Sequence, residues 1–380
     1  MKQLKDIATY VSDKIDAKSM NIPDYISTDN MLPQRGGIIP CTAKPEASRV
    51  TQYLPGDVLV SNIRPYFKKI WFSNRIGGCS SDVIVFRVLD ENKTYPKYLY
   101  YLLSQDIFFD YMMAGSNGTK MPRGNKKLIP EFTFYDVDIE KQKRIANILS
   151  AYDDLIENNQ KQIKLLEEAA MRLYKEWFVN LRFPGYETTK IIDGVPEGWG
   201  RKKLIDIADI IMGQSPKSEY YNDRQQGLPF HQGVTNYGHR FVTDETYSTS
   251  YTRIAEAGSV LFSVRAPVGR MNISKNKIVI GRGLAAINHK EDLQSFLFYM
   301  LKNRFYKDNL IGNGAIYASI TKDALHSQEF LIPFDNLANE FNNVGKSIDQ
   351  QITNADRQIV LLKQARDKML PKLMSGEIEV

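Results

Sequence analysis

Apolar residues recur every three or four positions from Lys141 to Trp177, and no Pro or Gly interrupts the run. This spacing is typical of the seam of a coiled-coil helix, with charged side chains between the seam positions. The run therefore predicts one long helix. Its seam consists of Ile145, Leu149, Tyr152, Ile156, Asn159, Ile163, Leu166, Ala170, Leu173 and Trp177.

The same seam returns 196 residues later. Asn158 and Gln162 have counterparts in Asn354 and Gln358, and a chance similarity between two amphipathic helices would not match these polar positions. Because one helix cannot bury its apolar seam alone, we expect the two to pair antiparallel. The second seam consists of Phe341, Gly345, Ile348, Ile352, Ala355, Ile359, Leu362, Arg366, Met369 and Leu373.

Three seam positions depart from the apolar pattern. Gly345 and Arg366 either weaken the packing of the second helix or serve a partner. Asn159 has two interpretations: a buried amide that fixes the register of the helix pair opposite Ile359, or a partly exposed break in the stripe.

The segments between the helices are also duplicated. The pattern Leu-x-Asp-Ile-Ala occurs at Leu4 and again at Leu204. Stretches rich in Val, Ile, Tyr and Phe at 57–61, 69–73 and 82–88 predict strands, and 95–113 predicts a helix. We therefore expect an α+β fold with two pseudo-symmetric domains separated by a long antiparallel two-helix coiled coil. The predicted boundaries are 1–139 for the first domain, 140–182 for the first helix, 183–198 for a linker rich in Gly and Pro, 199–335 for the second domain and 336–376 for the second helix.

The net charge of +6 is concentrated in the two domains. Residues 1–139 carry 18 basic against 15 acidic side chains, and residues 199–335 carry 17 against 13. A mild basic excess is compatible with a polyanionic partner. No apolar run approaches the roughly 20 residues of a membrane span, and the first residues do not resemble a signal peptide, so we expect a cytoplasmic protein. Cys41 and Cys79 lack paired spacing, which predicts reduced thiols.

Motifs of catalysis and cofactor binding are missing from the sequence. There is no phosphate-binding loop, dinucleotide fingerprint, zinc-protease helix or nucleophile elbow, and the four histidines show no metal-ligand spacing. Gly281-Arg282-Gly283 is predicted to be a turn rather than a phosphate loop. Asp82, Glu91 and Lys93 loosely match the ligand set of a metal-dependent nuclease, and the last two also fit a polar surface turn. We predict no catalytic, cofactor-binding or metal-binding residue.

The positive signal is a series of basic residues in loops beside aromatics and glycines. Lys and Arg neutralise phosphates, and an Arg fork pairs with the edge of guanine; the alternative is solubilising surface charge. Arg64 and Arg265 each follow a Val-Leu-x-Ser strand next to a Pro, so we interpret them as positional duplicates, shared either for binding or for a structural ion pair. The candidates are Arg64, Lys68, Lys69, Lys120, Arg123, Lys126 and Lys127, and Arg253, Arg265, Arg270, Arg282, Arg304 and Lys307.

Taken together, these features resemble the specificity subunit of type I restriction-modification enzymes. The resemblance covers essentially the whole chain. It rests on the duplicated layout, on the helix run KQKRIANILSAYDDLIENNQKQIKLLEEAAMRLYKEWF, on the exit VNLRFPGYE followed by VPEGW, and on GQSPKSEYYND with GLPFHQGVTNYG.

The resemblance implies a function. Two target recognition domains would each read one half of a split double-stranded DNA sequence. The helices would be the conserved spacer regions that hold two modification subunits, which carry S-adenosylmethionine and methylate a flipped adenine. Restriction subunits would bring ATP- and Mg²⁺-dependent translocation and cleavage, so this chain would be non-catalytic. The alternatives are the specificity subunit of another bipartite system, a metal-dependent nuclease and a structural coiled-coil adaptor.

Overall fold

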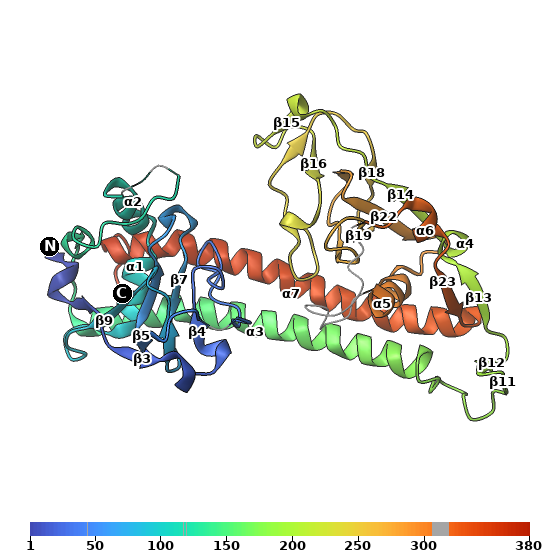
Figure 1. Ribbon diagram of the computed structural model, residues 1–380, viewed down its shortest axis with the longest axis horizontal. Helices are drawn as coiled ribbons and strands as arrows, with labels where there is room; N and C mark the ends of the chain where they lie inside the picture. The colour runs from blue at the N-terminus through green and yellow to red at the C-terminus, as the bar shows by residue number, and fades with distance from the viewer. Residues whose placement is uncertain (44, 117, 119, 306–318) are drawn as a thin grey trace. The chain divides into compact units, whose positions relative to one another are not determined.

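The computed structural model describes residues 1–43, 45–116, 118, 120–305 and 319–380. They form two compact units. The first unit consists of Met1–Asn159 and Arg357–Val380, and the second of Gln160–Asp356. Two long helices, α3 (Ile139–Phe178) and α7 (Asp335–Ser375), each contribute a segment to both units (Figure 1). The two long helices predicted from the repeated seam are therefore present.

The first unit is built on two four-stranded sheets, ordered β2-β9-β6-β7 and β3-β5-β8-β4. All pairs are antiparallel except β4 with β8. Strands β1 and β10, from the beginning and the end of residues 1–139, form a separate two-stranded antiparallel sheet. The strands are β1 (Lys2–Gln3), β2 (Ala8–Tyr10), β3 (Lys14–Asp16), β4 (Tyr25–Ile26), β5 (Arg49–Tyr53), β6 (Val58–Ser61), β7 (Ile70–Phe72), β8 (Gly77–Cys79), β9 (Val83–Val88) and β10 (Thr133–Phe134).

Strand β6 is a continuous apolar run because both of its faces are covered. Val58 and Val60 face the core formed with α1 (Pro96–Ser104), whereas Leu59 faces a smaller core that contains Ile26 and Tyr53. Side chains alternate along a strand, so one run of apolar residues serves two cores.

The second unit repeats this architecture. Its inner sheet is ordered β14-β22-β19-β20, and its outer sheet, β15-β17-β16-β21-β18, keeps one parallel pair, β16 with β21. A pair β13-β23 matches β1-β10. The strands are β13 (Gly200–Lys203), β14 (Ala208–Met212), β15 (Tyr221–Asn222), β16 (Leu228–His231), β17 (Tyr247–Ser248), β18 (Ile254–Ala255), β19 (Val260–Ser263), β20 (Met271–Ile273), β21 (Ile278–Ile280), β22 (Leu284–His289) and β23 (Glu329–Ile332).

The repeated Leu-x-Asp-Ile-Ala segments have the same local hydrogen bonding in both units. The backbone amide of Gln3 donates to Asp6 Oδ2 at 2.8 Å, and that of Lys203 donates to Asp206 Oδ2 at 3.0 Å. The remaining helices of the second unit are α4 (Leu204–Ile207), α5 (Gln294–Phe305) and α6 (Lys322–His326). The prediction of a duplicated α+β fold is confirmed.

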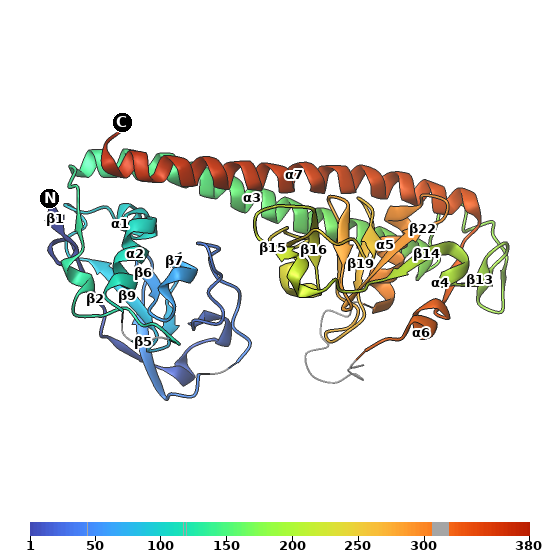
Figure 2. The same cartoon turned by 90° about the horizontal axis from the view of Figure 1, so that it is seen from above.

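The two long helices pair antiparallel within each unit (Figure 1, Figure 2). In the first unit Leu149 of α3 lies in one core with Leu373 of α7, and the Tyr152 hydroxyl lies 3.2 Å from Met369 Sδ. In the second unit the ring of Phe341 packs 5.6 Å from that of Tyr174. The core of each unit is thus completed by residues from both helices.

Every seam position is buried or half-buried. Asn159 is only 7% exposed, so its interpretation as a partly exposed break does not fit the structure. The buried positions are Ile145, Leu149, Ile156, Asn159, Ile163, Ala170, Phe341, Gly345, Ile352, Ala355, Ile359, Arg366 and Leu373; the half-buried ones are Tyr152, Leu166, Leu173, Trp177, Ile348, Leu362 and Met369.

The two other irregular seam residues have structural reasons. Arg366 is buried and donates from Nη1 to Asp153 Oδ1 of α3 at 2.6 Å, so it ties the helices together. A Cβ added to Gly345 would lie 2.8 Å from Ser295 Cβ, because α5 packs closely against α7 at this point. Neither residue is a defect in the helix pair.

The single helix predicted for 95–113 is wrong. The segment forms α1 and α2 (Asp106–Ala114), separated by Gln105 in an extended conformation with ψ of 148°. Arg35 Nε donates to the carbonyl oxygen of Ser104 at 2.5 Å, an acceptor that a continuous helix would use for Phe108. The break thus leaves this carbonyl free to accept from a distant loop.

Further features bear on the remaining expectations. Residues 183–198, predicted to be a linker, contain a hairpin of β11 (Ile191–Ile192) and β12 (Val195–Pro196). Both cysteines are free, and burial raises the pKa of the Cys79 thiol to about 12. Within the described residues, none of the helices combines the length and apolar character needed to cross a membrane.

The Gly345 contact gives a stability prediction. Replacing Gly345 by Leu, the residue at the matching position of α3, should destabilise the second unit, because the new side chain must displace Ser295. Overpacking costs about 1–3 kcal/mol, more than the roughly 1 kcal/mol returned by helix propensity. Chemical denaturation measures the change. Val344→Leu, at the exposed neighbouring position, is the control; equal stability of the two variants would contradict the prediction.

Candidate nucleic-acid interface

Three loops of the first unit are joined by backbone hydrogen bonds. The amide of Gln34 donates to Phe67 O at 2.8 Å, and that of Arg64 donates to Pro122 O at 2.8 Å. We call residues 33–36, 62–69 and 122–126 the first loop cluster. It lies where β6 ends, so a sheet with two buried faces supports it.

The first loop cluster holds its backbone in an unusual conformation. Gln34, Arg35, Arg64 and Lys68 have φ values of 52°, 58°, 48° and 52°, in the left-handed region that residues other than Gly rarely adopt. Each such residue costs of order 1 kcal/mol, and such residues concentrate at functional sites. The strained backbone therefore marks these loops as a candidate functional site, independently of their charge.

Asp106 holds two of these strained residues together. Its carboxylate accepts from Arg35 Nη2 and lies 2.8 Å from Lys68 Nζ. Burial alone would raise the pKa of Asp106, but hydrogen bonds from Lys68 and Arg35 outweigh it, so the pKa lies below its ordinary value. The break between α1 and α2 thus places the first residue of α2 under the loop cluster.

The first loop cluster presents aromatic and basic side chains together. Tyr66 and Phe67 are exposed, with ring centroids 4.7 Å apart, and Arg123 and Lys126 are exposed on the 122–126 loop, whose Pro122 carbonyl accepts from the Arg64 amide. Aromatic faces stack on bases and cations neutralise phosphates. The two aromatics were not among the candidates predicted from the sequence, although their position between two basic residues, in the order Arg-Pro-Tyr-Phe-Lys, was an available signal.

The second unit has a matching group of loops. The amide of Val264 donates to Gly283 O at 2.9 Å, and that of Gly283 donates to Gln232 O at 3.1 Å. Ser215 Oγ donates to Gln232 Oε1 at 2.7 Å. We call residues 213–215, 231–233, 264–270 and 281–283 the second loop cluster.

Glycines allow these chains to cross closely. A Cβ added to Gly213 would lie 2.1 Å from the carbonyl oxygen of Gly281, so only Gly fits there. Residues 281–283 form a turn between β21 and β22, as predicted, and the turn exposes Arg282. The Gly-Arg-Gly sequence therefore serves close packing and presents one cation.

The two loop clusters occupy equivalent places, with one correction to the sequence alignment. Ile63 forms an isolated bridge with Arg123, and Arg265 forms the same bridge with Ser319. Arg265 thus matches Ile63 rather than Arg64, and the two arginines are one position out of register. Arg64 also has a left-handed backbone with φ of 48°, which Arg265 does not share, so their side chains are not strict duplicates.

The predicted DNA contacts differ in accessibility. Lys69 turns inward and donates to Thr28 O at 2.6 Å, while Lys68 is paired as described above. Arg64, Lys68 and Lys69 are half-buried, and Lys307 lies outside the described residues. DNA contact stays a prediction for all candidates. The exposed ones are Lys120, Arg123, Lys126, Lys127, Arg253, Arg265, Arg270, Arg282 and Arg304.

The possible nuclease set is not assembled. Asp82 precedes the six-residue strand β9 and Glu91 follows it, which separates them by roughly 20 Å at about 3.3 Å per residue. Asp82 lies 3.2 Å from Arg123, and Lys93 pairs with Asp90 at 3.4 Å. Among the residues whose positions are described, no group of three or more His, Cys, Asp or Glu side chains could hold a metal ion.

Comparison with known proteins identifies the family. The model of the type I restriction modification DNA specificity domain matches residues 1–168 and again residues 196–366. The chain belongs to this specificity family. Its two matches correspond to the sequence duplication, and the prediction of a type I specificity subunit is confirmed.

Other members of the specificity family are similar over most of the chain. A Methanocaldococcus jannaschii protein named as the MjaX type I restriction enzyme specificity subunit is 33% identical over 77% of this chain and 70% of its own. The MjaIX specificity subunit of the same organism is 26% identical over 77% and 71%. The crystal structure of the S subunit from M. genitalium has a TM-score of 0.56 at 14% identity, covering 98% of this chain and 95% of that one, which shows a shared fold.

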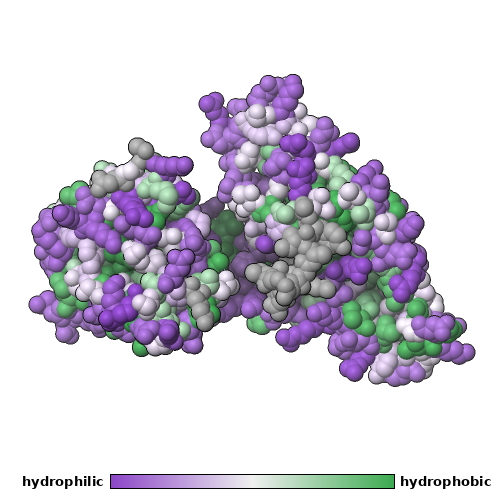
Figure 3. All heavy atoms as spheres, in the orientation of Figure 1, coloured by the Kyte–Doolittle hydropathy of each residue, from purple (hydrophilic) through white to green (hydrophobic). Residues whose placement is uncertain are grey.

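The surface of each unit is mainly polar on the face that Figure 3 shows. On the face drawn in Figure 3, the exposed side chains of both units are mainly hydrophilic, with scattered apolar residues between them. A large apolar patch would instead mark a hydrophobic partner.

Removing the charge of Asp106 should loosen the first loop cluster. Asp106→Asn removes the charge that holds Arg35 and Lys68, so amide hydrogen exchange should accelerate within 34–36 and 64–68. Because the pKa of Asp106 is lowered by folding, its contribution is present above the ordinary carboxyl pKa and is lost as pH falls through the lowered value.

A matched variant tests whether the effect is local. Glu131→Gln breaks another ion pair of the first unit, between Lys5 and Glu131, and should leave exchange in the cluster unchanged. Unaltered exchange within 64–68 in Asp106→Asn would contradict the assigned role.

Proposed function

We propose that the chain is the DNA-reading subunit of a type I restriction-modification complex and that each unit reads one half of a split DNA sequence. The duplicated placement of the two loop clusters carries this proposal. Each cluster lies where the central strand of a duplicated inner sheet ends, at Ser61 of β6 and at Ser263 of β19. Two similar supports with different loops suit two half-sites of different sequence.

The exposed side chains of the two loop clusters would make the contacts with DNA. Arg123, Lys126, Arg265 and Arg282 supply cations for phosphates and forks for guanine edges. Tyr66 offers an aromatic face in the first unit. Phosphate contacts would position each unit, and base contacts from the differing loop residues would give each half-site its sequence.

The long helices would carry the partners. Outside the seam, α3 and α7 expose charged residues along their length, including Lys164 and Arg172. We propose that these surfaces hold two modification subunits, which supply S-adenosylmethionine and methylate adenine. Restriction subunits would supply ATP- and Mg²⁺-dependent translocation and cleavage. This chain would then contribute no catalytic residue and would act in the cytoplasm.

Methylation mapping tests the proposal. Expressed with its modification subunit in a host that lacks other adenine methylation, the chain should direct methylation to one bipartite sequence with a fixed gap. Arg265→Ala should relax or abolish recognition of one half-site only. Two outcomes would refute the proposal: methylation at sites that share no bipartite sequence, or a complex that assembles but does not methylate DNA.

The alternatives have weaker support. The family match favours a type I system over another bipartite system; a neighbouring gene for a separate ATP-dependent restriction subunit distinguishes them. The separation of Asp82 from Glu91 disfavours the nuclease. Salt-dependent DNA binding by the complex would exclude a purely structural adaptor.

A further inference from the structure

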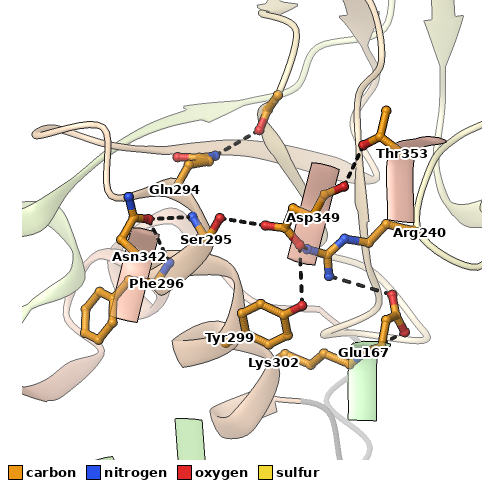
Figure 4. A network of polar contacts seen from close by, with 11 residues as sticks. Glu167, Arg240, Gln294, Ser295, Phe296, Tyr299, Lys302, Asn342, Asp349 and Thr353 are labelled. Atoms are coloured by element: carbon orange, nitrogen blue, oxygen red, sulfur yellow. Dashed lines mark hydrogen bonds and ion pairs between the residues drawn. The ribbon is translucent and has the colours of Figure 1, made fainter. Parts of the chain in front are cut away.

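Arg240 is a buried cation in a loop of the second unit. Its side chain is 2% exposed and reaches three helices (Figure 4). Nη2 donates to Asp349 Oδ1 of α7, and Nη1 lies 3.7 Å from Glu167 Oε1 of α3. The guanidinium carbon lies 3.5 Å from the ring centroid of Phe298 on α5. A buried arginine with these contacts joins its loop firmly to the helices.

The acceptor for Arg240 is held in place by neighbouring donors. Ser295 Oγ donates to Asp349 Oδ2 at 2.6 Å, and the Tyr299 hydroxyl lies 3.4 Å from Oδ1. Lys302 Nζ donates to Glu167 Oε2 at 3.2 Å (Figure 4). Two cations thus balance two half-buried carboxylates, so removing Arg240 leaves an excess of partly desolvated negative charge, which is unfavourable.

The backbone of Arg240 leads directly to the second loop cluster. Its carbonyl oxygen accepts from the amide of Ile273, the last residue of β20, at 2.9 Å. The side chain of Asn272 also donates to Gly238 O at 3.0 Å. Strand β20 begins at Met271, where the 264–270 loop ends. Only Met271 and Asn272 therefore lie between the Arg240 contact at Ile273 and the loop that carries Arg265.

The first unit has the same acceptor but a different arginine. Asp153 matches Asp349 at the 196-residue shift, and the Tyr101 hydroxyl donates to Asp153 Oδ2 at 2.6 Å. The guanidinium here is that of Arg366 on α7. In the second unit the position matching Arg366 is Ala170, which is buried and cannot supply the charge.

The element that carries the arginine determines which parts of the unit the ion pair connects. In the first unit Arg366 links one long helix to the other. In the second unit Arg240 links the recognition sheet to both helices. The matching half-buried carboxylates thus connect the two long helices in one copy of the duplication and fix a sheet and its loop in the other.

We propose that Arg240 is a positioning residue that fixes β20 and the 264–270 loop on the long helices, so that recognition of the half-site read by the second unit depends on it. The proposal rests on the proposed function of that unit. Arg240 itself need not touch DNA. Its loss acts by letting the loop move relative to its own support.

The test measures binding of the complex with its modification subunit to four duplexes: the mapped target, each half-site replaced alone, and both replaced. Arg240→Met should weaken binding to the intact target at least tenfold. The same loss should persist when the half-site of the first unit is replaced and should disappear when that of the second unit is replaced. Arg265→Ala identifies the half-site of the second unit.

Matched variants separate positioning from general damage. Arg240→Lys keeps the charge and should restore part of the affinity, and Lys277→Met, which breaks the exposed pair of Lys277 with Glu256 in the same unit, should bind as the unaltered protein does. If Arg240→Met does not assemble, Arg240→Lys and Tyr299→Phe are measured in the same way, and a smaller loss confined to the same half-site is expected.

Two results would overturn the inference: binding by the variants equal to that of the unaltered protein, or an equal loss on every duplex. A different result would instead refute the proposed function, namely that the unaltered complex shows no preference for any bipartite target. The two failures are therefore distinguishable.

Discussion

Burial of the apolar seam of α3 against that of α7 is the interaction on which the rest of the structure depends. Leu149 and Leu373 lie in one core with α1, although more than 200 residues separate them in the chain. Fully burying a leucine contributes about 1.5–3 kcal/mol, and several such residues from each helix are involved. The core of the first unit therefore requires both ends of the chain.

The duplication explains why two units share one architecture, and the departures from it explain how they differ. Leu149 fills a core position that becomes Gly345 in the second copy, where α5 approaches α7 more closely. Asp153 and Asp349 are retained, but Arg366 serves the first and Arg240 the second. Substitutions at matching positions have thus changed the anchoring of the sheets, while the strand order of the two inner sheets has stayed the same.

The sequence predicted those features that depend on periodicity. The long helices, their repeat and the strands β6, β7 and β9 follow from local patterns of apolar residues, because burial of a face imposes a regular spacing. The break at Gln105 could not be predicted, since the Arg35 contact that accompanies it comes from a loop 69 residues before Ser104. The one-residue offset between Arg64 and Arg265 could have been counted in the sequence, because Arg64 is the third residue after Ser61 and Arg265 is the second after Ser263; the bridge partners agree with this register.

The candidate interface was predictable in kind rather than in detail. Basic loop residues were visible in the sequence, but whether a lysine faces solvent, as Lys126 does, or turns inward, as Lys69 does, depends on contacts with other loops. Arg240 looked like any other charged loop residue, because its carboxylate partners lie on helices distant in sequence. Asp106 was overlooked for the same reason, because Arg35 and Lys68 are distant from it in sequence.

The most direct test of this account perturbs the end of the chain and measures the beginning. Leu373→Asp places a charge in the core of the first unit, so amide hydrogen exchange should accelerate in α1 while α5 of the second unit keeps its protection. Leu361→Asp, at an exposed position of the same helix, is the control and should change neither. Unchanged exchange in α1, or an equal acceleration in α5, would contradict the claim that α7 completes the core of the first unit.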